Sequence, residues 1–184
     1  MRFLPVVLAS AAAMALSGCL IIAADGGTRT VVVQDADPNA FPSDADQRGA
    51  LYAASIADPR RPEGEVARDP LRAPLAMLEF AEVRPGDRIA DIRPEEGYFT
   101  RLFAPVVGTE GRVYAFVPTR TAAREDAFAD GLATEYGNVV RITWALDSMS
   151  FPEPLDTVFM AQEYHDFHIA GFNTDVAAMN RAVF

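Results

Sequence analysis

The sequence contains no lysine: all 16 basic residues in its 184 positions are arginines. This absence excludes a Schiff-base lysine as a catalytic group and the lysine of a phosphate-binding loop. A single cysteine, Cys19, excludes a disulfide within the chain and a zinc site built from cysteines. The 26 acidic residues give a formal net charge of -10. That charge argues against nucleic acid as a partner, because phosphate binding requires a basic surface.

The first nineteen residues have the layout of a secretory signal peptide. Arg2 supplies a positive charge, an apolar run follows, and two small residues precede Cys19. The tetrapeptide Leu-Ser-Gly-Cys resembles the lipobox of bacterial lipoproteins, in which the cysteine is lipidated and becomes the first mature residue. The resemblance implies lipidation of Cys19 and a membrane attachment at the periplasmic face of the envelope, with the outer membrane as the expected location. An uncleaved anchor is the alternative, because the apolar stretch to Ala24 is just long enough to span a bilayer.

Composition divides the remaining chain into two parts. Residues 20–65 are rich in Asp, Pro, Gly, Ala and Arg and show no sustained apolar period, which predicts a flexible tether. A short helix over residues 47–56 is the alternative within that segment. Regular structure is expected over residues 66–184, a length typical of one domain.

The pattern of residues 66–184 predicts strands that alternate with helices. A helix should begin at Asp69, with Pro70 in its first turn and with Leu71, Leu75 and Leu78 on one apolar face. Further strands and helices are expected, in chain order, at 88–92 (strand), 98–107 (helix), 112–117 (strand), 119–136 (helix), 139–144 (strand), 156–161 (strand) and from 171 onward (helix). Such an alternation indicates right-handed crossovers and a parallel sheet, in which ligands bind at the carboxyl ends of the strands.

The loop after the first of these strands carries the strongest motif. Residues 91–100, Asp-Ile-Arg-Pro-Glu-Glu-Gly-Tyr-Phe-Thr, resemble the first motif of class I S-adenosylmethionine-dependent methyltransferases, in which a strand, an acid, a glycine-rich turn and a helix follow one another. The chain is most similar to a bacterial group of predicted, often exported, methyltransferases, which have a proline, three glycines and Tyr-Phe-Thr at this place. The similarity extends over about residues 65–184. It includes the segments 68–74, 113–118, 153–156, 162–166 and 180–184.

The resemblance implies an α/β fold with a Rossmann-like, mostly parallel sheet. This sheet would be incomplete at the C-terminus, because a fifth strand and a final hairpin should follow Phe184 in that fold. The implied cofactor is S-adenosylmethionine, framed by Asp91, Pro94, Gly97 and Tyr98. The implied reaction is methyl transfer to a small-molecule or envelope-associated acceptor.

The segment after the fourth strand is where such methyltransferases often place catalytic residues. Tyr164, His165 and Asp166 would face the acceptor, and His165 beside Asp166 has the chemistry of a base near neutral pH. The alternative is that His165 and Asp166 cap the following loop or helix. A metal site formed with His168 is not expected, because the two histidines lack the spacing of a helical metal-binding pair.

Two glutamates depart from the glycine turn of the family. Glu95 and Glu96 stand where the family has glycine, and a left-handed backbone at a non-glycine residue costs roughly 1–2 kcal/mol. Each carboxylate would also oppose the carboxylate of the cofactor, at roughly 3 kcal/mol per pair for about 5 Å and an effective dielectric near 20. Weak or absent cofactor binding is therefore expected. The alternative function is a non-catalytic envelope lipoprotein that retains the fold without the cofactor.

Overall fold

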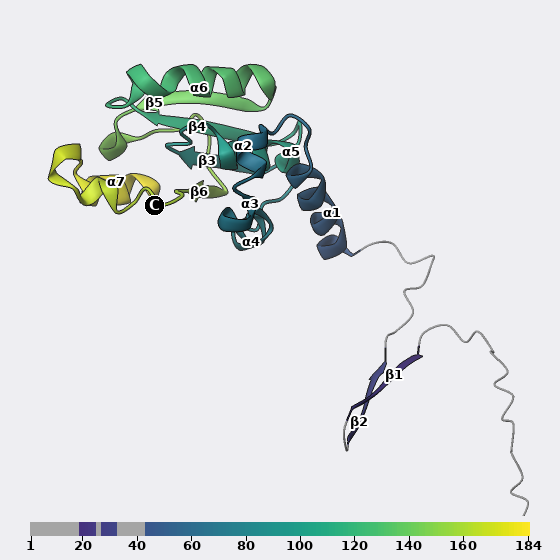
Figure 1. Ribbon diagram of the computed structural model, residues 1–184. Coiled ribbons are helices and arrows are strands. Elements are labelled where there is room, and N and C mark those ends of the chain that lie inside the picture. The colour runs from purple at the N-terminus through teal and green to yellow at the C-terminus, as the bar shows by residue number, and fades with distance from the viewer. Residues whose placement is uncertain (1–18, 25–26, 33–42) are drawn as a thin grey trace, which may run out of the picture. The chain divides into compact units, whose positions relative to one another are not determined.

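The computed structural model describes residues 19–24, 27–32 and 43–184 (Figure 1). Strands β1 (Cys19–Ala24) and β2 (Gly27–Val32) form an antiparallel hairpin inside the segment that was expected to be a tether. Residues 1–18 of the predicted signal peptide and residues 33–42 of the predicted tether lie outside the described residues. Within the described ranges, none of the helices combines the length and apolar character needed to cross a bilayer.

Residues 43–184 form one compact unit built on a four-stranded sheet, in the order β5-β4-β3-β6. The strands are β3 (Arg88–Ile92), β4 (Arg112–Pro118), β5 (Val139–Trp144) and β6 (Thr157–Phe159). All three pairings are parallel, so the predicted Rossmann-like α/β class is confirmed. The chain passes from β3 through β4 to β5 and then returns to β6 on the other side of β3. The strand order therefore reverses between β3 and β6, and β6 lies at one edge of the sheet.

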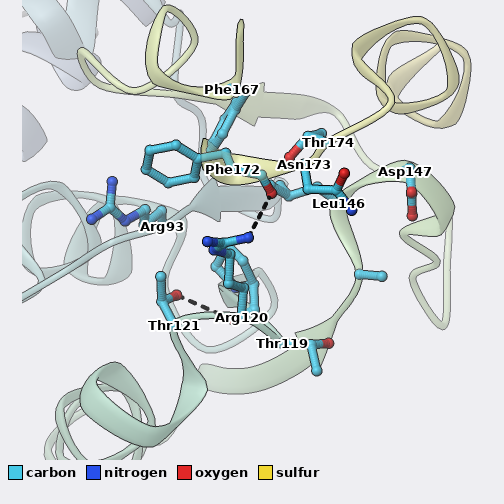
Figure 2. A pocket seen from close by; sticks show the side chains of 12 residues that line it. Arg93, Thr119, Arg120, Thr121, Leu146, Asp147, Phe167, Phe172, Asn173 and Thr174 are labelled. Carbon is cyan, nitrogen blue, oxygen red and sulfur yellow. Dashed lines mark hydrogen bonds between the residues drawn. The ribbon is translucent and has the colours of Figure 1, made fainter. Parts of the chain in front are cut away.

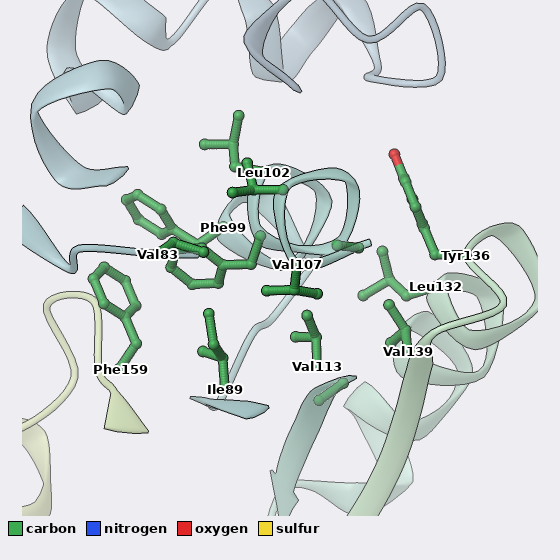
Figure 3. Close-up of a cluster of buried hydrophobic side chains, with 14 of the residues drawn as sticks. Val83, Ile89, Phe99, Leu102, Val107, Val113, Leu132, Tyr136, Val139 and Phe159 are labelled. Carbon is green, nitrogen blue, oxygen red and sulfur yellow. The ribbon is translucent and has the colours of Figure 1, made fainter. Parts of the chain in front are cut away.

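Successive residues of a strand point to opposite sides of the sheet, so these apolar strands present an apolar surface on each face. Both faces are covered. Ile89 and Val113 pack on one side against α5 and α6, together with Leu102 and Leu132 (Figure 3). The opposite face carries a second apolar cluster that includes residues of α7 and of the loop after β5. The bounds of these helices are α5 (Tyr98–Val107), α6 (Ala122–Glu135) and α7 (Val176–Val183). Three 3₁₀ turns lie on the loops: η1 (Leu146–Ser148), η2 (Asp166–His168) and η3 (Ala170–Phe172).

Helix α1 (Asp44–Ile56) includes the short helix over residues 47–56 that the sequence left open as an alternative to a tether. Ser43 caps the helix: its Oγ accepts from the backbone N–H of Asp46 at 3.2 Å, and the Asp46 carboxylate accepts in return from the Ser43 backbone at 3.1 Å. Tyr52 is buried and donates to the Val83 carbonyl at 2.8 Å, and Ser55 donates to the Leu102 carbonyl at 2.6 Å. The folded unit therefore begins at Ser43 and not at Val66. Two specific side chains anchor a helix whose apolar residues are otherwise mostly alanines.

The helix predicted from Asp69 is divided into α3 (Asp69–Arg72) and α4 (Pro74–Phe80), and α2 (Glu63–Val66) precedes them. Ala73 between them is left-handed, with φ of 45°. A proline disfavours the α conformation at the residue before it and supplies no N–H, which explains the break. The predicted apolar face is wrong as a result: Leu78 is fully buried, whereas Leu71 is 90% exposed and Leu75 is half exposed.

Candidate functional site

Two of the cavities at the carboxyl ends of the strands include residues of the predicted site or of the loops beside it. The β4–β5 cavity, of about 340 Å³, is lined by the loop after β4, the loop after β5 and residues from 167 to 174 (Figure 2). The β3–β6 cavity, of about 140 Å³, is lined by the turn after β3, the residues after β6, and two arginines of the N-terminal helices, Arg68 and Arg72. Arg93 lines both cavities. A parallel sheet binds its ligands at this edge, next to the point where the strand order reverses.

The turn between β3 and α5 has a left-handed backbone at three alternate residues: φ is 57° at Arg93, 52° at Glu95 and 95° at Gly97. The Gly97 N–H donates to the Pro94 carbonyl at 2.8 Å. A Cβ at Gly97 would also lie 2.5 Å from the side chain of Leu132, so this position requires glycine. The strain expected at Glu95 and Glu96 therefore falls on Glu95 and on Arg93, at roughly 1–2 kcal/mol each.

Asp91 is the next-to-last residue of β3 and is buried, with 2% of its surface exposed. The hydroxyl of Thr100, in the first turn of α5, donates to its carboxylate at 2.7 Å. Burial raises the pKa of Asp91 to about 6, although the hydrogen bonds from Thr100 oppose this shift. Asp91 thus ties the end of the strand to the helix that follows the turn, and it lines the β3–β6 cavity.

Arg93 is surrounded by carboxylates from three parts of the chain. Its guanidinium pairs with Glu163 after β6 and with Glu125 of α6, at 3.3 Å from the latter. Asp166 and Glu95 lie farther away, at 3.8 and 3.7 Å. The Arg93 side chain is only 9% exposed, and burial raises the pKa of Glu163. Glu125 and Glu163 therefore hold the Arg93 side chain in place between the two cavities that it lines.

The sequence interpretation missed the roles of Arg93, Glu125 and Glu163. The residues predicted to frame a cofactor in and around this loop were Asp91, Pro94, Gly97 and Tyr98, and Arg93 was not among them. The available signal was a basic residue two positions after Asp91, inside a turn otherwise expected to be glycine-rich. Its partners lie 32 and 70 residues away along the chain, and no local pattern indicates such distant pairs.

Glu95 and Glu96, which stand where the sequence resemblance leads one to expect glycine, each lie beside an arginine. The carboxylate of Glu95 is 3.7 Å from Arg93, and that of Glu96 is 3.8 Å from Arg68. Both side chains are more than half exposed to solvent. The repulsion expected between these carboxylates and an anionic ligand group applies to unpaired charges, whereas each carboxylate here has an arginine nitrogen within 4 Å.

Tyr98 lines the β3–β6 cavity together with Asp91 and Pro94. Its hydroxyl donates to the Asp69 carboxylate at 2.6 Å, and Arg61 binds that same carboxylate through two nitrogens, at 2.6 and 3.0 Å. Burial raises the pKa of Tyr98. This side chain therefore fastens the N-terminal helices to α5, and its ring forms one wall of the cavity.

The residues predicted to face an acceptor line neither of these two cavities. The Tyr164 hydroxyl is hydrogen-bonded to the Asn180 side chain of α7, and its ring lies edge-on to His168. His165 is 74% exposed, with its Nε2 at 3.1 Å from Asp166. Only Asp166 reaches the network around Arg93. Neither His165 nor Asp166 forms a side-chain cap on η2, so the alternative capping role is not observed there.

The β4–β5 cavity combines apolar walls with polar ends. Leu146, Phe167 and Phe172 contribute the apolar surface, and Asp147 is the one carboxylate among the residues that line it. Arg120, drawn between Arg93 and Asp147 in Figure 2, donates to the Phe172 carbonyl at 3.1 Å. This combination suits a ligand with a flat apolar part and polar groups at its edges.

A scan against protein-family models finds no match, and no curated protein matches the sequence. Among solved structures, the chain is similar to a SAM dependent methyltransferase from Aquifex aeolicus, with 22% identity, a TM-score of 0.48, and coverage of 61% of this chain and 58% of that one. A SAM-dependent O-methyltransferase from Thermotoga maritima gives 18% identity, a TM-score of 0.41, and coverage of 78% and 47%. For a protein-L-isoaspartate O-methyltransferase the identity is 17%, the TM-score is 0.39, and the match covers 77% of this chain and 33% of that one. The chain thus spans between one third and three fifths of the length of these structures.

Proposed function

We propose that residues 43–184 form an S-adenosylmethionine-dependent methyltransferase domain that acts on a small or envelope-associated acceptor. The observation that carries this proposal is the turn after β3, which keeps a left-handed backbone at Arg93, Glu95 and Gly97. Strain of roughly 1–2 kcal/mol at each of two non-glycine residues is typical of turns held for a ligand. The resemblance of residues 91–100 to the first methyltransferase motif supports the same conclusion.

The residues of the two cavities fit the two halves of this cofactor. In the β4–β5 cavity, Leu146 and Phe172 offer apolar walls to the adenine, and the Asp147 carboxylate can accept from its amino group. In the β3–β6 cavity, Arg72 can bind the carboxylate of the methionine half, and Glu163 can bind its ammonium group. The cofactor, when bound, supplies an electrophilic methyl group on a sulfonium. The chain contributes binding and orientation, which account for much of the rate of such a transfer.

Arg93 stands where these two halves would join. A ligand that spans both cavities requires this side chain to turn aside, away from Glu125 and Glu163. Breaking those contacts has a cost in free energy, which lowers the affinity of the unmodified chain. Weak cofactor binding is therefore expected, as the sequence indicated, but with Arg93 as the main cause in place of the two glutamates of the turn.

Titration calorimetry with S-adenosylmethionine tests this proposal on the full chain. We expect submillimolar or weaker binding by the unmodified protein. Arg93→Gly, which joins the cavities and relieves the left-handed strain, should bind at least about tenfold more tightly. The double change of Glu95 and Glu96 to glycine should give a smaller gain. Arg84→Ala is the matched control, because this exposed arginine lines neither cavity. Folded variants that all fail to bind would contradict the proposal and favour the non-catalytic alternative.

We place the acceptor beside Tyr164, His165 and Asp166. The exposure of His165 and its contact with Asp166 support a base that is accessible to a large acceptor. Replacing His165 with glutamine should lower methyl transfer and leave calorimetric binding of S-adenosylmethionine unchanged. A loss of cofactor binding in that variant, or unchanged transfer, would contradict this placement.

We also propose that the protein is exported and carries lipid on Cys19, at the periplasmic face of the envelope. The apolar run that ends in Leu-Ser-Gly before the single cysteine supports this location. Several acyl chains on one residue anchor a protein stably, whereas one chain does not. Such an anchor would hold the domain close to envelope-associated acceptors.

A further inference from the structure

The end of β4 contributes hydroxyl and guanidinium groups to the lining of the β4–β5 cavity and no carboxylate, and the Thr121 hydroxyl already donates to Glu125 at 2.8 Å. Thr119, Arg120 and Thr121 follow the strand and line the cavity. Asp147, the one carboxylate in the lining, belongs instead to the loop after β5. The carboxylate of the lining and Arg120 therefore come from different loops, Asp147 from the loop after β5 and Arg120 from the loop after β4.

This distribution decides which ligand group suits the end of β4. In dinucleotide-binding α/β folds, an acid about 20 residues beyond the glycine turn accepts from the ribose hydroxyls, whereas an arginine there accommodates a phosphate on the ribose. Here Val117 and Pro118 occupy that place, and Arg120 follows them. A guanidinium has five N–H donors and no acceptor, so it cannot accept a hydrogen bond from a ribose hydroxyl, and its strongest partners are charged oxygens such as those of phosphate.

The charge of Arg120 is available for such a contact. Within the described part of the chain, no carboxylate oxygen lies within 4.0 Å of its guanidinium, and its hydrogen bond is to the Phe172 carbonyl. Arg93, the other arginine in the lining, is by contrast held by Glu125 and Glu163. The Arg120 guanidinium also lies 5.8 Å from the centre of the Phe172 ring, which keeps it at the cavity wall (Figure 2).

We propose that the β4–β5 cavity binds an adenosine nucleotide with a phosphate on its ribose, and that Arg120 is the residue that recognises this phosphate. The adenine lies between the apolar walls with its amino group toward Asp147, and the ribose lies at the end of β4. This ligand goes beyond the proposed methyl transfer. It shares the cavity of the adenosyl half and therefore competes with S-adenosylmethionine.

Calorimetric titrations of the full chain with adenosine 2′-monophosphate and with adenosine test this proposal. We expect adenosine 2′-monophosphate to bind about tenfold more tightly than adenosine, or better, as one charge-assisted phosphate contact provides. Adenosine 5′-monophosphate is the positional control and should gain less. Arg120→Gln should remove the preference for the phosphate over adenosine, and Arg120→Lys should keep part of it. Arg112→Gln, at the other end of the same strand, is the matched control and should keep all of it.

Equal affinities for adenosine and its 2′-phosphate, or a preference that survives Arg120→Gln, would overturn this inference, as would the absence of binding by either compound. A competition titration separates it from the proposed function. If the unmodified chain binds S-adenosylmethionine but shows no preference for the 2′-phosphate, only the inference about Arg120 is refuted. Tight nucleotide binding without any S-adenosylmethionine binding would support the inference and refute the proposed methyl transfer.

Discussion

The buried carboxyl of Asp91 gives the domain a predictable dependence of stability on pH. Its pKa is raised from the ordinary value of 3.8 to about 6 because burial disfavours the charged form. In the unfolded chain the group ionises at its ordinary pKa. Between about pH 4 and pH 6 the folded state therefore holds more protons at this position than the unfolded state does.

The sign of the effect follows from that difference. Where the folded state binds more protons, the free energy of unfolding falls as the pH rises. The loss begins near pH 4 and is complete above about pH 7. A shift of about two pKa units corresponds to roughly 3 kcal/mol. The variant Asp91→Asn keeps an acceptor for the Thr100 hydroxyl and has no charge to bury, so it escapes this loss.

Urea denaturation of the unmodified protein and of Asp91→Asn, at intervals from pH 4 to pH 8, measures the effect. Relative to the variant, the unmodified protein should lose roughly 3 kcal/mol between the two ends of this range. Thr100→Val should extend the loss to higher pH, because the hydroxyl hydrogen bond lowers the pKa of Asp91. Glu110→Gln, in the exposed turn after α5, controls for the removal of one acid. A difference between the unmodified protein and Asp91→Asn that stays constant with pH would refute the reasoning.

Three further predictions follow from local geometry and from the N-terminal sequence. In the same denaturation assay, Gly97→Ala should destabilise the domain by roughly 2–4 kcal/mol, because an alanine there has a strained left-handed backbone and overpacks against Leu132. Gly131→Ala in α6 is the control and should be neutral or stabilising, because a Cβ there meets nothing within 4 Å. Tyr52→Phe should lower the free energy of unfolding by about 1 kcal/mol, because the Val83 carbonyl loses its hydrogen-bond donor. Limited proteolysis should remove residues only up to the start of α1, and rapid cleavage inside α1 would contradict the packing of that helix. Mass spectrometry of the mature protein should show an acylated N-terminal Cys19, and an intact N-terminal methionine on membrane-bound protein would contradict the lipoprotein hypothesis.

The sheet could be predicted from the sequence because its strands are short apolar runs bounded by turn residues. Residues 88–92 and 139–144 were predicted with the bounds that the structure has. The helix over 98–107 was also correct, since its apolar residues cover most of its surface and it is buried between the sheet and α1. Alternation of strands and helices then implied parallel pairing and a site at the carboxyl edge, where both cavities lie.

The remaining features depend on contacts that no local pattern records. Helix α1 has a weak apolar period, and its place in the fold rests on Tyr52 and Ser55, whose partners lie 31 and 47 residues away. The break at Ala73 was foreseeable from Pro74, but the regular spacing of leucines on either side suggested a continuous helix. The ion pairs of Arg93 join the turn after β3 to α6 and to the segment after β6. These are segments that only the folded sheet brings together.

The Arg93 network links the stability of the domain to occupation of its site. The side chain of Glu163 is 11% exposed and its carboxylate pairs with the Arg93 guanidinium, whereas Glu125, 4% exposed, also accepts from Arg124 at 2.7 Å and from Thr121 at 2.8 Å. Loss of Arg93 therefore affects mainly Glu163. Removing one member of a buried ion pair typically costs about 3–5 kcal/mol, because the other charge remains buried. Arg93→Gly regains only roughly 1–2 kcal/mol of left-handed strain, so the variant should be less stable than the unmodified protein.

A cationic ligand can replace the lost guanidinium as the charge partner of these acids. S-adenosylmethionine carries an ammonium and a sulfonium, and in Arg93→Gly these groups would face Glu125 and Glu163. At a ligand concentration one hundred times the dissociation constant, binding stabilises the folded state by about 2.7 kcal/mol. Thermal denaturation should therefore show a larger rise in midpoint with S-adenosylmethionine for Arg93→Gly than for the unmodified protein. Adenosine, which has the same base without the positive charges, is the control ligand and should give a smaller rise. Two results would contradict a cation-binding site formed by Glu125 and Glu163. One is that Arg93→Gly is as stable as the unmodified protein, and the other is that both ligands raise the thermal midpoint of Arg93→Gly equally.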